Sequence, residues 1–178
     1  MAAFRKGLRR SFSRLMRTRP ARAVARVLLP PAERLVRLAS RGRWQLSSAL
    51  VPSLTLRTTG ARSGLPRETV LMCLPRGEEL VVVGSNFGDA RHPAWTANLL
   101  AHPEALIRHR GRVRRVTAAL VVGAERESLW DELEEQWPEY RAYERDSGRE
   151  LRIFRLSPAA RGGERGAAEG DAHEPGAE

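Results

Sequence analysis

The feature that most constrains the fold of this chain is a set of six short apolar runs between residues 54 and 156, most of them separated only by turn residues. Runs of this length that are rich in Val, Leu and Thr are typical of β-strands. We predict strands over residues 54–58, 67–74, 79–84, 105–109, 113–122 and 151–156. The continuous run Val81-Val82-Val83 indicates a strand that is buried on both faces. Because most of these strands follow one another directly in sequence, they predict an antiparallel sheet that closes, or nearly closes, into a barrel.

Two to three helices are predicted to lie outside this sheet. Pro93 suits the first turn of a helix over residues 93–100. Leu129 and Leu133 share one face of a helix over residues 124–135, and Pro138 opens a further short helix. A chain of 178 residues is long enough for one domain with a substantial core. The expected fold class is therefore α+β, a mostly antiparallel barrel of about six strands with peripheral helices.

The charge of the chain is concentrated in its N-terminal segment. Residues 1–44 contain 13 Arg or Lys against one acid, Glu33, a net charge of +12, whereas residues 45–178 contain 18 basic and 20 acidic residues. Blocks of like charge mark interaction arms rather than parts of a core. The last residues are Gly, Ala, Glu and Asp without apolar periodicity, which is typical of disorder. We expect a basic arm over residues 1–44, a folded domain over residues 45–157 and a disordered tail over residues 158–178.

The basic arm has the pattern of an amphipathic helix. Its apolar face contains Phe4, Leu8, Phe12, Leu15 and Met16, and most of its Arg side chains lie off that face. Such a helix can lie on an anionic membrane surface. A solvated arm, a mitochondrial transit peptide and a nucleic-acid contact are the alternatives. The last is disfavoured because interleaved aromatic residues and a recognisable nucleic-acid-binding module are lacking.

The sequence predicts no membrane-spanning helix. Its apolar stretches are all much shorter than the hydrocarbon core of a bilayer requires. The expected location is therefore the cytoplasm, with peripheral contact between the arm and the inner face of the plasma membrane as a further expectation.

Several common classes of site are absent from the sequence. There is neither a GxxxxGK phosphate loop nor a GxGxxG fingerprint, and there is no HExxH zinc motif. The single cysteine, Cys73, rules out a disulfide framework, and its apolar neighbours predict a buried thiol. His92, His102 and His109 lack metal-ligand spacing and are interpreted as surface residues. No metal site is predicted.

The first polar cluster that can carry a function is the loop 60–67, which follows a predicted strand. Arg57, Arg62 and Arg67 lie close together in sequence there, and Gly60 and Gly64 are flexible points. The backbone N–H groups and guanidinium forks of such a loop can bind an anion. A solvated basic hairpin has the same composition, so both interpretations stay open at this point.

Two further clusters follow along the chain. Ser85 and Asn86 lie where a strand ends in a Gly-flanked loop, a place where polar side chains commonly face a ligand. An ordinary turn has the same composition. Trp137, Tyr140 and Tyr143 recur at a spacing of three, which places them on one helix face. They can form an aromatic wall over a flat substrate, or they can pack into the core.

In this order and at these distances, the clusters resemble the deazaflavin-dependent nitroreductase family of actinobacteria, small split-barrel proteins that bind coenzyme F420. The matching segments are Thr58-Thr59-Gly60-Ala61-Arg62-Ser63-Gly64-Leu65-Pro66-Arg67, Val81-Val82-Val83-Gly84-Ser85-Asn86-Phe87-Gly88, His92-Pro93-Ala94-Trp95 with Asn98-Leu99, and Pro138-Glu139-Tyr140-Arg141-Ala142-Tyr143. The resemblance implies a split β-barrel related to FMN-binding oxidoreductases. It also implies that reduced coenzyme F420 donates a hydride to a quinone-like or nitroaromatic substrate.

The resemblance implies roles for particular residues. The loop 60–67 would hold the phosphate and the glutamate tail of the coenzyme, anions that suit the bidentate fork of Arg. Ser85, Tyr140 and Tyr143 would be the catalytic residues, and Trp137, Tyr140 and Tyr143 would contact the substrate. The implied coenzyme-binding residues are Arg57, Thr59, Gly60, Arg62, Ser63, Gly64, Pro66, Arg67, Ser85, Asn86, Trp95 and Asn98.

Three positions depart from the family pattern. Ala61 stands where the family often has a basic residue, Asn86 where at least one member has lysine, and Trp137 where a member has tyrosine. The missing base at Ala61 predicts weaker binding of the coenzyme tail. The leading hypothesis is an F420-dependent quinone reductase or nitroreductase. The alternative is a module that carries the coenzyme, or an aromatic or lipid ligand, without turnover.

Overall fold

The computed structural model describes residues 51–159 and seven separate positions in the arm: Thr18, Pro20, Ala21, Val24, Leu28, Ala32 and Leu35. The predicted apolar face over residues 4–16 and the predicted tail from residue 160 onward lie outside the described residues. Val24, Leu28 and Leu35 are helical, and their exposed fractions are 55%, 59% and 69%. No helix in the described part of the chain is long and apolar enough to cross a membrane.

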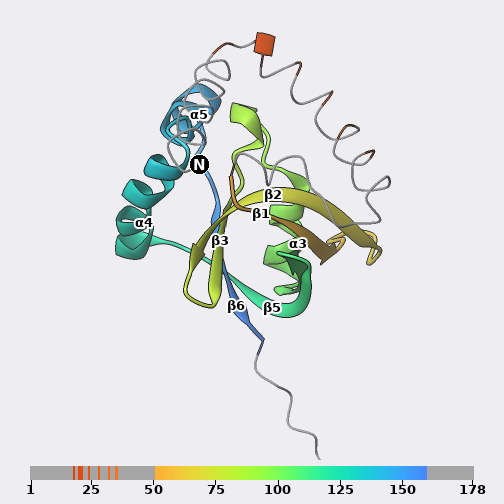
Figure 1. Cartoon of the computed structure of the whole chain (residues 1–178). Coiled ribbons are helices and arrows are strands. Elements are labelled where there is room, and N and C mark those ends of the chain that lie inside the picture. The colour runs from red at the N-terminus through yellow and green to blue at the C-terminus, as the bar shows by residue number, and fades with distance from the viewer. Residues whose placement is uncertain are drawn as a thin grey trace, which may run out of the picture.

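Six antiparallel strands form a closed barrel in the order β1-β2-β3-β6-β5-β4 (Figure 1). They are β1 (Ser53–Thr59), β2 (Pro66–Arg76), β3 (Glu79–Val83), β4 (Glu104–His109), β5 (Arg112–Leu120) and β6 (Ile153–Pro158). The barrel closes because β1 pairs with both β2 and β4. The predicted fold class, an antiparallel barrel with peripheral helices, is confirmed.

The strand ends differ from the predicted ones where the chain turns out of the sheet. Val121 and Val122 lie beyond β5, and Gly123, with a φ of 61°, turns the chain into the next helix. Gly84 lies beyond β3, although its N–H still donates to the carbonyl of Arg152 at 2.8 Å. Because β3 and β5 end before the predicted positions, the residues after them belong to the connecting segments rather than to the sheet.

Within residues 51–159, three α-helices lie outside the barrel: α3 (Ala94–Ala101), α4 (Gly123–Gln136) and α5 (Tyr140–Ser147). Helix α3 begins directly after Pro93, close to the predicted start. Helix α5 begins at Tyr140, two residues after Pro138. Helices α4 and α5 lie together on one side of the barrel, away from α3 (Figure 1).

The described residues form two hydrophobic clusters, one on each side of the barrel wall. The inner cluster contains Leu80 and Val82 of β3, and Trp95 of α3 joins it from one end. The outer cluster contains Val81 and Val83 and packs against α4 and α5. Strand β3 is thus buried on both faces, as its apolar run predicts.

Cys73 belongs to the inner cluster and is buried, so the prediction of a buried thiol is confirmed. Burial raises the pKa of the Cys73 thiol to about 12. At neutral pH this thiol stays protonated and acts as a small apolar side chain.

Candidate functional site

Helix α3 fastens the loop 60–65 to the end of the barrel. Asn98 accepts a hydrogen bond from the Ala61 N–H through Oδ1 (2.9 Å), and its Nδ2 donates to Thr58 Oγ1 (3.0 Å). Asn98 is only 7% exposed. Because a buried amide that loses its partners costs free energy, these two bonds fix the loop relative to α3.

The loop itself is a compact turn. The Gly60 N–H donates to the Leu65 carbonyl (2.9 Å), and the Gly64 N–H donates to the Gly60 carbonyl (2.8 Å). Gly64 has a φ of 65°, a conformation that favours glycine. A Cβ on Gly60 would lie 2.6 Å from Ser63 Oγ, so the turn has no room for a side chain there. Both glycines therefore shape the loop.

The outer side of this loop has the chemistry of an anion site. Arg62 and Ser63 are exposed, and their N–H groups make no hydrogen bond within the described residues. Arg67, at the start of β2, is also exposed. Two available N–H groups with nearby guanidinium groups suit a phosphate or a carboxylate.

The sheet separates Arg57 from Arg67. Arg67 pairs with Thr58, whose hydroxyl faces Asn98 of α3, whereas Arg57 is the next residue along β1. Successive residues of a strand point to opposite faces. Arg57 therefore shares the outer face of the barrel with Leu106 and, through the β4–β5 pairing, with Arg115. The proximity of Arg57 and Arg67 in sequence does not become proximity on one surface.

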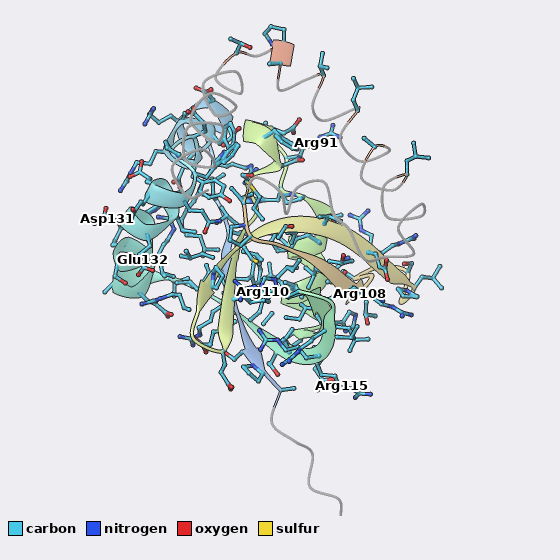
Figure 2. All side chains as sticks on the ribbon, in the orientation of Figure 1. Arg91, Arg108, Arg110, Arg115, Asp131 and Glu132 are labelled. Carbon is cyan, nitrogen blue, oxygen red and sulfur yellow. The ribbon has the colours of Figure 1, made fainter. Side chains whose placement is uncertain are left out.

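Ser85 and Asn86 lie in a loop over residues 84–92 that is folded tightly. The short 3-10 helix η2 (Asn86–Gly88) contains Asn86 with a φ of 46° and Phe87 with a φ of 52°. These values are unfavourable for residues other than glycine, so neighbouring groups must hold them. One such contact is the hydrogen bond from Asn86 Nδ2 to the carbonyl of Arg91 (3.1 Å), a residue marked beside this loop in Figure 2.

Helix α3 also contacts the start of this second loop. A Cβ on Gly84 would lie 2.8 Å from Thr96 Cγ2, and Arg152 donates to Thr96 Oγ1 at 3.2 Å. Helix α3 thus touches the loop 60–65 through Asn98 and the loop 84–92 through Thr96. The fold brings together the two polar loops that the sequence separates by about twenty residues.

Arg149, which sequence reasoning missed, holds the loop 84–92 from the other side. Its guanidinium donates to the carbonyls of Gly84, Ser85 and Asp89 and contacts His92 Nδ1. Burial lowers the pKa of Arg149 below its usual range. Its position after Gly148 gives no sequence signal for this role, because the loop that it contacts lies about sixty residues earlier.

Trp137, Tyr140 and Tyr143 are buried in the outer cluster, with exposed fractions of 3%, 2% and 1%. Phe87 of η2 is partly buried and packs against this cluster, so the loop that contains Ser85 lies next to the aromatic side chains. Burial raises the pKa of the Tyr140 hydroxyl. Tyr140 thus offers a neutral hydroxyl donor at the edge of the core.

Trp95 lies in the inner cluster, with its ring centroid 5.7 Å from that of Phe154. Thr59 and Pro66 form the last pair of the β1–β2 ladder, directly before the compact loop. Trp95 therefore supports α3 from within the barrel, and the Thr59–Pro66 pair fixes the base of the loop.

The interpretation of the histidines as plain surface residues is wrong for two of them. His92 is half-buried against Arg149, and His109 Nδ1 lies 3.0 Å from the carbonyl oxygen of Ser53. His102 is exposed. No group of three or more His, Cys, Asp or Glu within the described residues is arranged to hold a metal ion.

Comparison with known proteins then decides the family. The family model described as F420H(2)-dependent quinone reductase matches residues 36–158. The chain belongs to this family. The match begins inside the predicted basic arm and ends at the last residue of β6. The family and the split-barrel fold that the sequence motifs imply are therefore confirmed.

Several known proteins share parts of this sequence or of its fold. The chain is 45% identical over 56 residues to the F420H(2)-dependent quinone reductase Rv1261c of Mycobacterium tuberculosis, a stretch that covers 32% of this chain and 38% of that protein. A solved F420-H2 dependent reductase, FDR-A, is 32% identical, with a TM-score of 0.55 over 60% of this chain and 94% of its own. A chain described as a domain-swapped dimer is 28% identical, with a TM-score of 0.56 over 71% of this chain and 96% of its own.

Proposed function

We propose that this protein is an oxidoreductase that uses reduced coenzyme F420 to transfer a hydride to a quinone-like or nitroaromatic substrate. Family membership supports the proposal. The observation that carries it is the position of α3, which joins an exposed basic loop to a second loop beside buried aromatic side chains. An anionic coenzyme tail and a flat reacting ring require these two environments next to each other.

The residues of the first loop fit the anionic part of the coenzyme. We assign direct contact with its phosphate and tail to Arg62, Ser63 and Arg67, which are exposed and have donors available. The other members of the candidate set shape this surface or support it: Thr59, Gly60, Gly64, Pro66, Trp95 and Asn98. Arg57 adds positive charge from the outer face of the barrel.

The second loop and α5 provide the substrate side. When bound, the reduced coenzyme supplies the hydride. We propose that Ser85 or Tyr140 donates a hydrogen bond to the substrate oxygen where negative charge develops, and that Asn86 lines the coenzyme side. Burial raises the pKa of Tyr140, so its hydroxyl stays protonated and can donate at neutral pH. Tyr143 and Trp137 exclude water beside it.

Substrate contact with the aromatic side chains requires local opening, because Tyr140 and Tyr143 are buried in this structure. Phe87 is one of three partly buried side chains at the edge of their cluster, with Met72 and Leu74, and it lies in a strained segment of the loop 84–92. We propose that the substrate enters beside Phe87, since a strained segment has a low cost of local opening.

The experiment that tests this function is a titration of the purified protein with reduced and with oxidised coenzyme F420, followed by a turnover assay with menadione. Binding at micromolar coenzyme together with menadione reduction is the expected result. Absence of binding would reject the proposal. Binding without turnover of quinones and nitroaromatics would instead favour a module that carries the coenzyme.

We also propose that the N-terminal arm brings the protein to an anionic membrane, where a lipid-soluble quinone would be met. The net charge of +12 over residues 1–44 supports this, because each basic residue is attracted to anionic lipid. Val24 and Leu28 support it as well, since both are helical and their spacing of four places two exposed apolar side chains on one helical face.

A further inference from the structure

We propose that Arg149 is a positioning residue that fixes the backbone of Ser85 and ties the loop 84–92 to α5, which contains Tyr140 and Tyr143. The inference rests on the proposed function, because it concerns the groups that would face the substrate. Its structural part concerns residues of this chain alone and can be tested without coenzyme.

The contacts of Arg149 reach both ends of the loop. At the start of the loop, Nη1 donates to the Gly84 carbonyl (3.1 Å) and Nη2 donates to the Ser85 carbonyl (2.8 Å). At the end of the loop, Nε donates to the Asp89 carbonyl (2.9 Å), and Nη1 lies 3.1 Å from His92 Nδ1. One side chain therefore bridges the two ends of a segment that would otherwise be free to spread.

The loop needs such a bridge because its own backbone is strained. Asn86 and Phe87 have φ values of 46° and 52°, which cost free energy in residues that carry a Cβ. The Gly88 N–H donates to the Ser85 carbonyl (3.0 Å), so Arg149 and Gly88 share this acceptor. Without the guanidinium, the turn would keep this local hydrogen bond and the packing of Phe87, but it would lose the side chain that holds both of its ends.

The attachment point at the end of α5 is itself fixed. Gly148, with a φ of 65°, caps α5 by donating its N–H to the carbonyl of Glu144 at 3.2 Å. The side chain of Glu144 accepts from Arg126 Nη2 (2.6 Å) and from the Leu151 N–H (3.2 Å). Arg149 lies between Gly148 and Leu151, which are both held by these hydrogen bonds. Its side chain therefore fixes the Ser85 loop relative to the end of α5.

Only arginine can make this set of contacts. Its planar fork presents donors in several fixed directions, whereas lysine presents three donors from a single atom. Arg149→Lys keeps the charge but cannot reach carbonyls on both sides of the fork. Arg149→Lys and Arg149→Ala should therefore behave alike if geometry matters, and differently if charge alone matters.

The test compares Arg149→Lys and Arg149→Ala with the control Arg145→Ala, an exposed arginine one turn earlier in α5. The first readout, on the protein without coenzyme, is amide hydrogen exchange at Gly88 and Asp89, whose N–H groups bond within the loop. We expect faster exchange there in both Arg149 variants, with unchanged protection in the barrel strands.

The second readout is steady-state turnover, where a misplaced loop should lower kcat by about 10²-fold. Coenzyme affinity should fall much less than kcat, since Asn86 lies in the displaced loop but the loop 60–65, which we assign to the coenzyme tail, is held separately by Asn98.

Three outcomes would overturn the inference: unchanged exchange at Gly88 and Asp89, unchanged kcat, or loss of protection spread over the whole barrel. The last would mean that Arg149 only stabilises the fold. If the wild-type protein fails to bind coenzyme F420, the proposed function is rejected, but the exchange measurement still decides whether Arg149 orders the loop. The two proposals can therefore fail separately.

Discussion

The Tyr140 hydroxyl is the single group on which the proposed chemistry depends most. It is neutral because burial raises its pKa, so it can donate a hydrogen bond at neutral pH. Removal of one donor of this kind lowers kcat by about 10²–10³-fold. We therefore expect Tyr140→Phe to reduce menadione turnover to that extent, while fluorescence titration gives an unchanged coenzyme affinity. Unchanged turnover in Tyr140→Phe and in Ser85→Ala would contradict the assignment.

We expect His92 to make the order of the Ser85 loop dependent on pH. Its Nδ1 lies 3.1 Å from Arg149, so it can accept a hydrogen bond only when the imidazole is neutral. Burial, with further contributions from Arg152 and Arg149, lowers the pKa of His92 in the folded protein. The contribution of this contact to stability is therefore complete above the ordinary pKa of about 6.5 and is lost as the pH falls through the folded value.

The corresponding experiment measures exchange at the Gly88 amide across this pH range, corrected for the intrinsic pH dependence of exchange. Wild type should lose protection as the pH falls, whereas His92→Ala should show lower protection that depends less on pH. His102→Ala, which changes an exposed histidine, should behave as wild type. Identical profiles for wild type and His92→Ala would show that the imidazole plays no part.

These residues also show how far single side chains can be predicted from sequence. The positions of Gly60 and Gly64 follow from local turn chemistry, which a linear pattern contains. The contacts of Arg149 join residues about sixty positions apart, and they arise only after the barrel has closed. Whether Arg57 and Arg67 lie on opposite faces of the sheet depends on the register between β1 and β2. If that register shifted by one residue, the two side chains would lie on the same face.

Among the elements, α3 determines how the two halves of the site meet. Asn98→Ala removes both hydrogen bonds of its side chain and leaves the Ala61 N–H and the Thr58 hydroxyl without that partner. The cost of such a loss is about 1–3 kcal/mol, part of which coenzyme binding would have to restore. We expect the dissociation constant for coenzyme F420 to rise about tenfold. Leu100→Ala, which shortens an exposed side chain on the same helix, should leave it unchanged.

A rise in KM for menadione with no change in coenzyme affinity would contradict this role of Asn98. It would place the effect at the loop 84–92, which α3 contacts through Thr96. Coenzyme titration and substrate kinetics on the same preparation separate the two results.

The elements themselves are the part of the fold that the sequence predicts best. Each of the six strands has its own apolar run and its own turn residues, and local periodicity is sufficient to locate it. The closure of β1 against β4 is different, because it joins strands that α3 and two other strands separate in sequence. Burial of the Trp137, Tyr140 and Tyr143 side chains also depends on closure, since an aromatic helix face can line a site or a core.

At the scale of the whole molecule, positive charge outside the proposed coenzyme site occurs in two separate places. One is the arm, with a net charge of +12 over residues 1–44. The other is the β4–β5 hairpin, where Arg108, Arg110, Arg112 and Arg115 are exposed and make no ion pair within the described residues. Figure 2 shows Arg108, Arg110 and Arg115 over this hairpin and Asp131 and Glu132 on the far side, on α4. Either basic region alone would attract an anionic surface, so the two must be tested separately.

Matched charge variants can distinguish these regions. The arm variant replaces Arg5, Arg9, Arg10 and Arg14 by Gln, and the hairpin variant replaces Arg108, Arg110, Arg112 and Arg115 by Gln. Each basic residue near an anionic membrane contributes about 1 kcal/mol, so loss of four should weaken binding about 10³-fold if that region lies on the surface. We expect this loss in co-sedimentation with phosphatidylserine vesicles for the arm variant, and near wild-type binding for the hairpin variant.

Binding of the wild type should weaken at 1 M salt, where the Debye length is about 3 Å, and should be weak to purely zwitterionic vesicles. Equal losses in both variants would mean that the barrel itself faces the membrane, and no loss in the arm variant would reject the arm as the membrane contact.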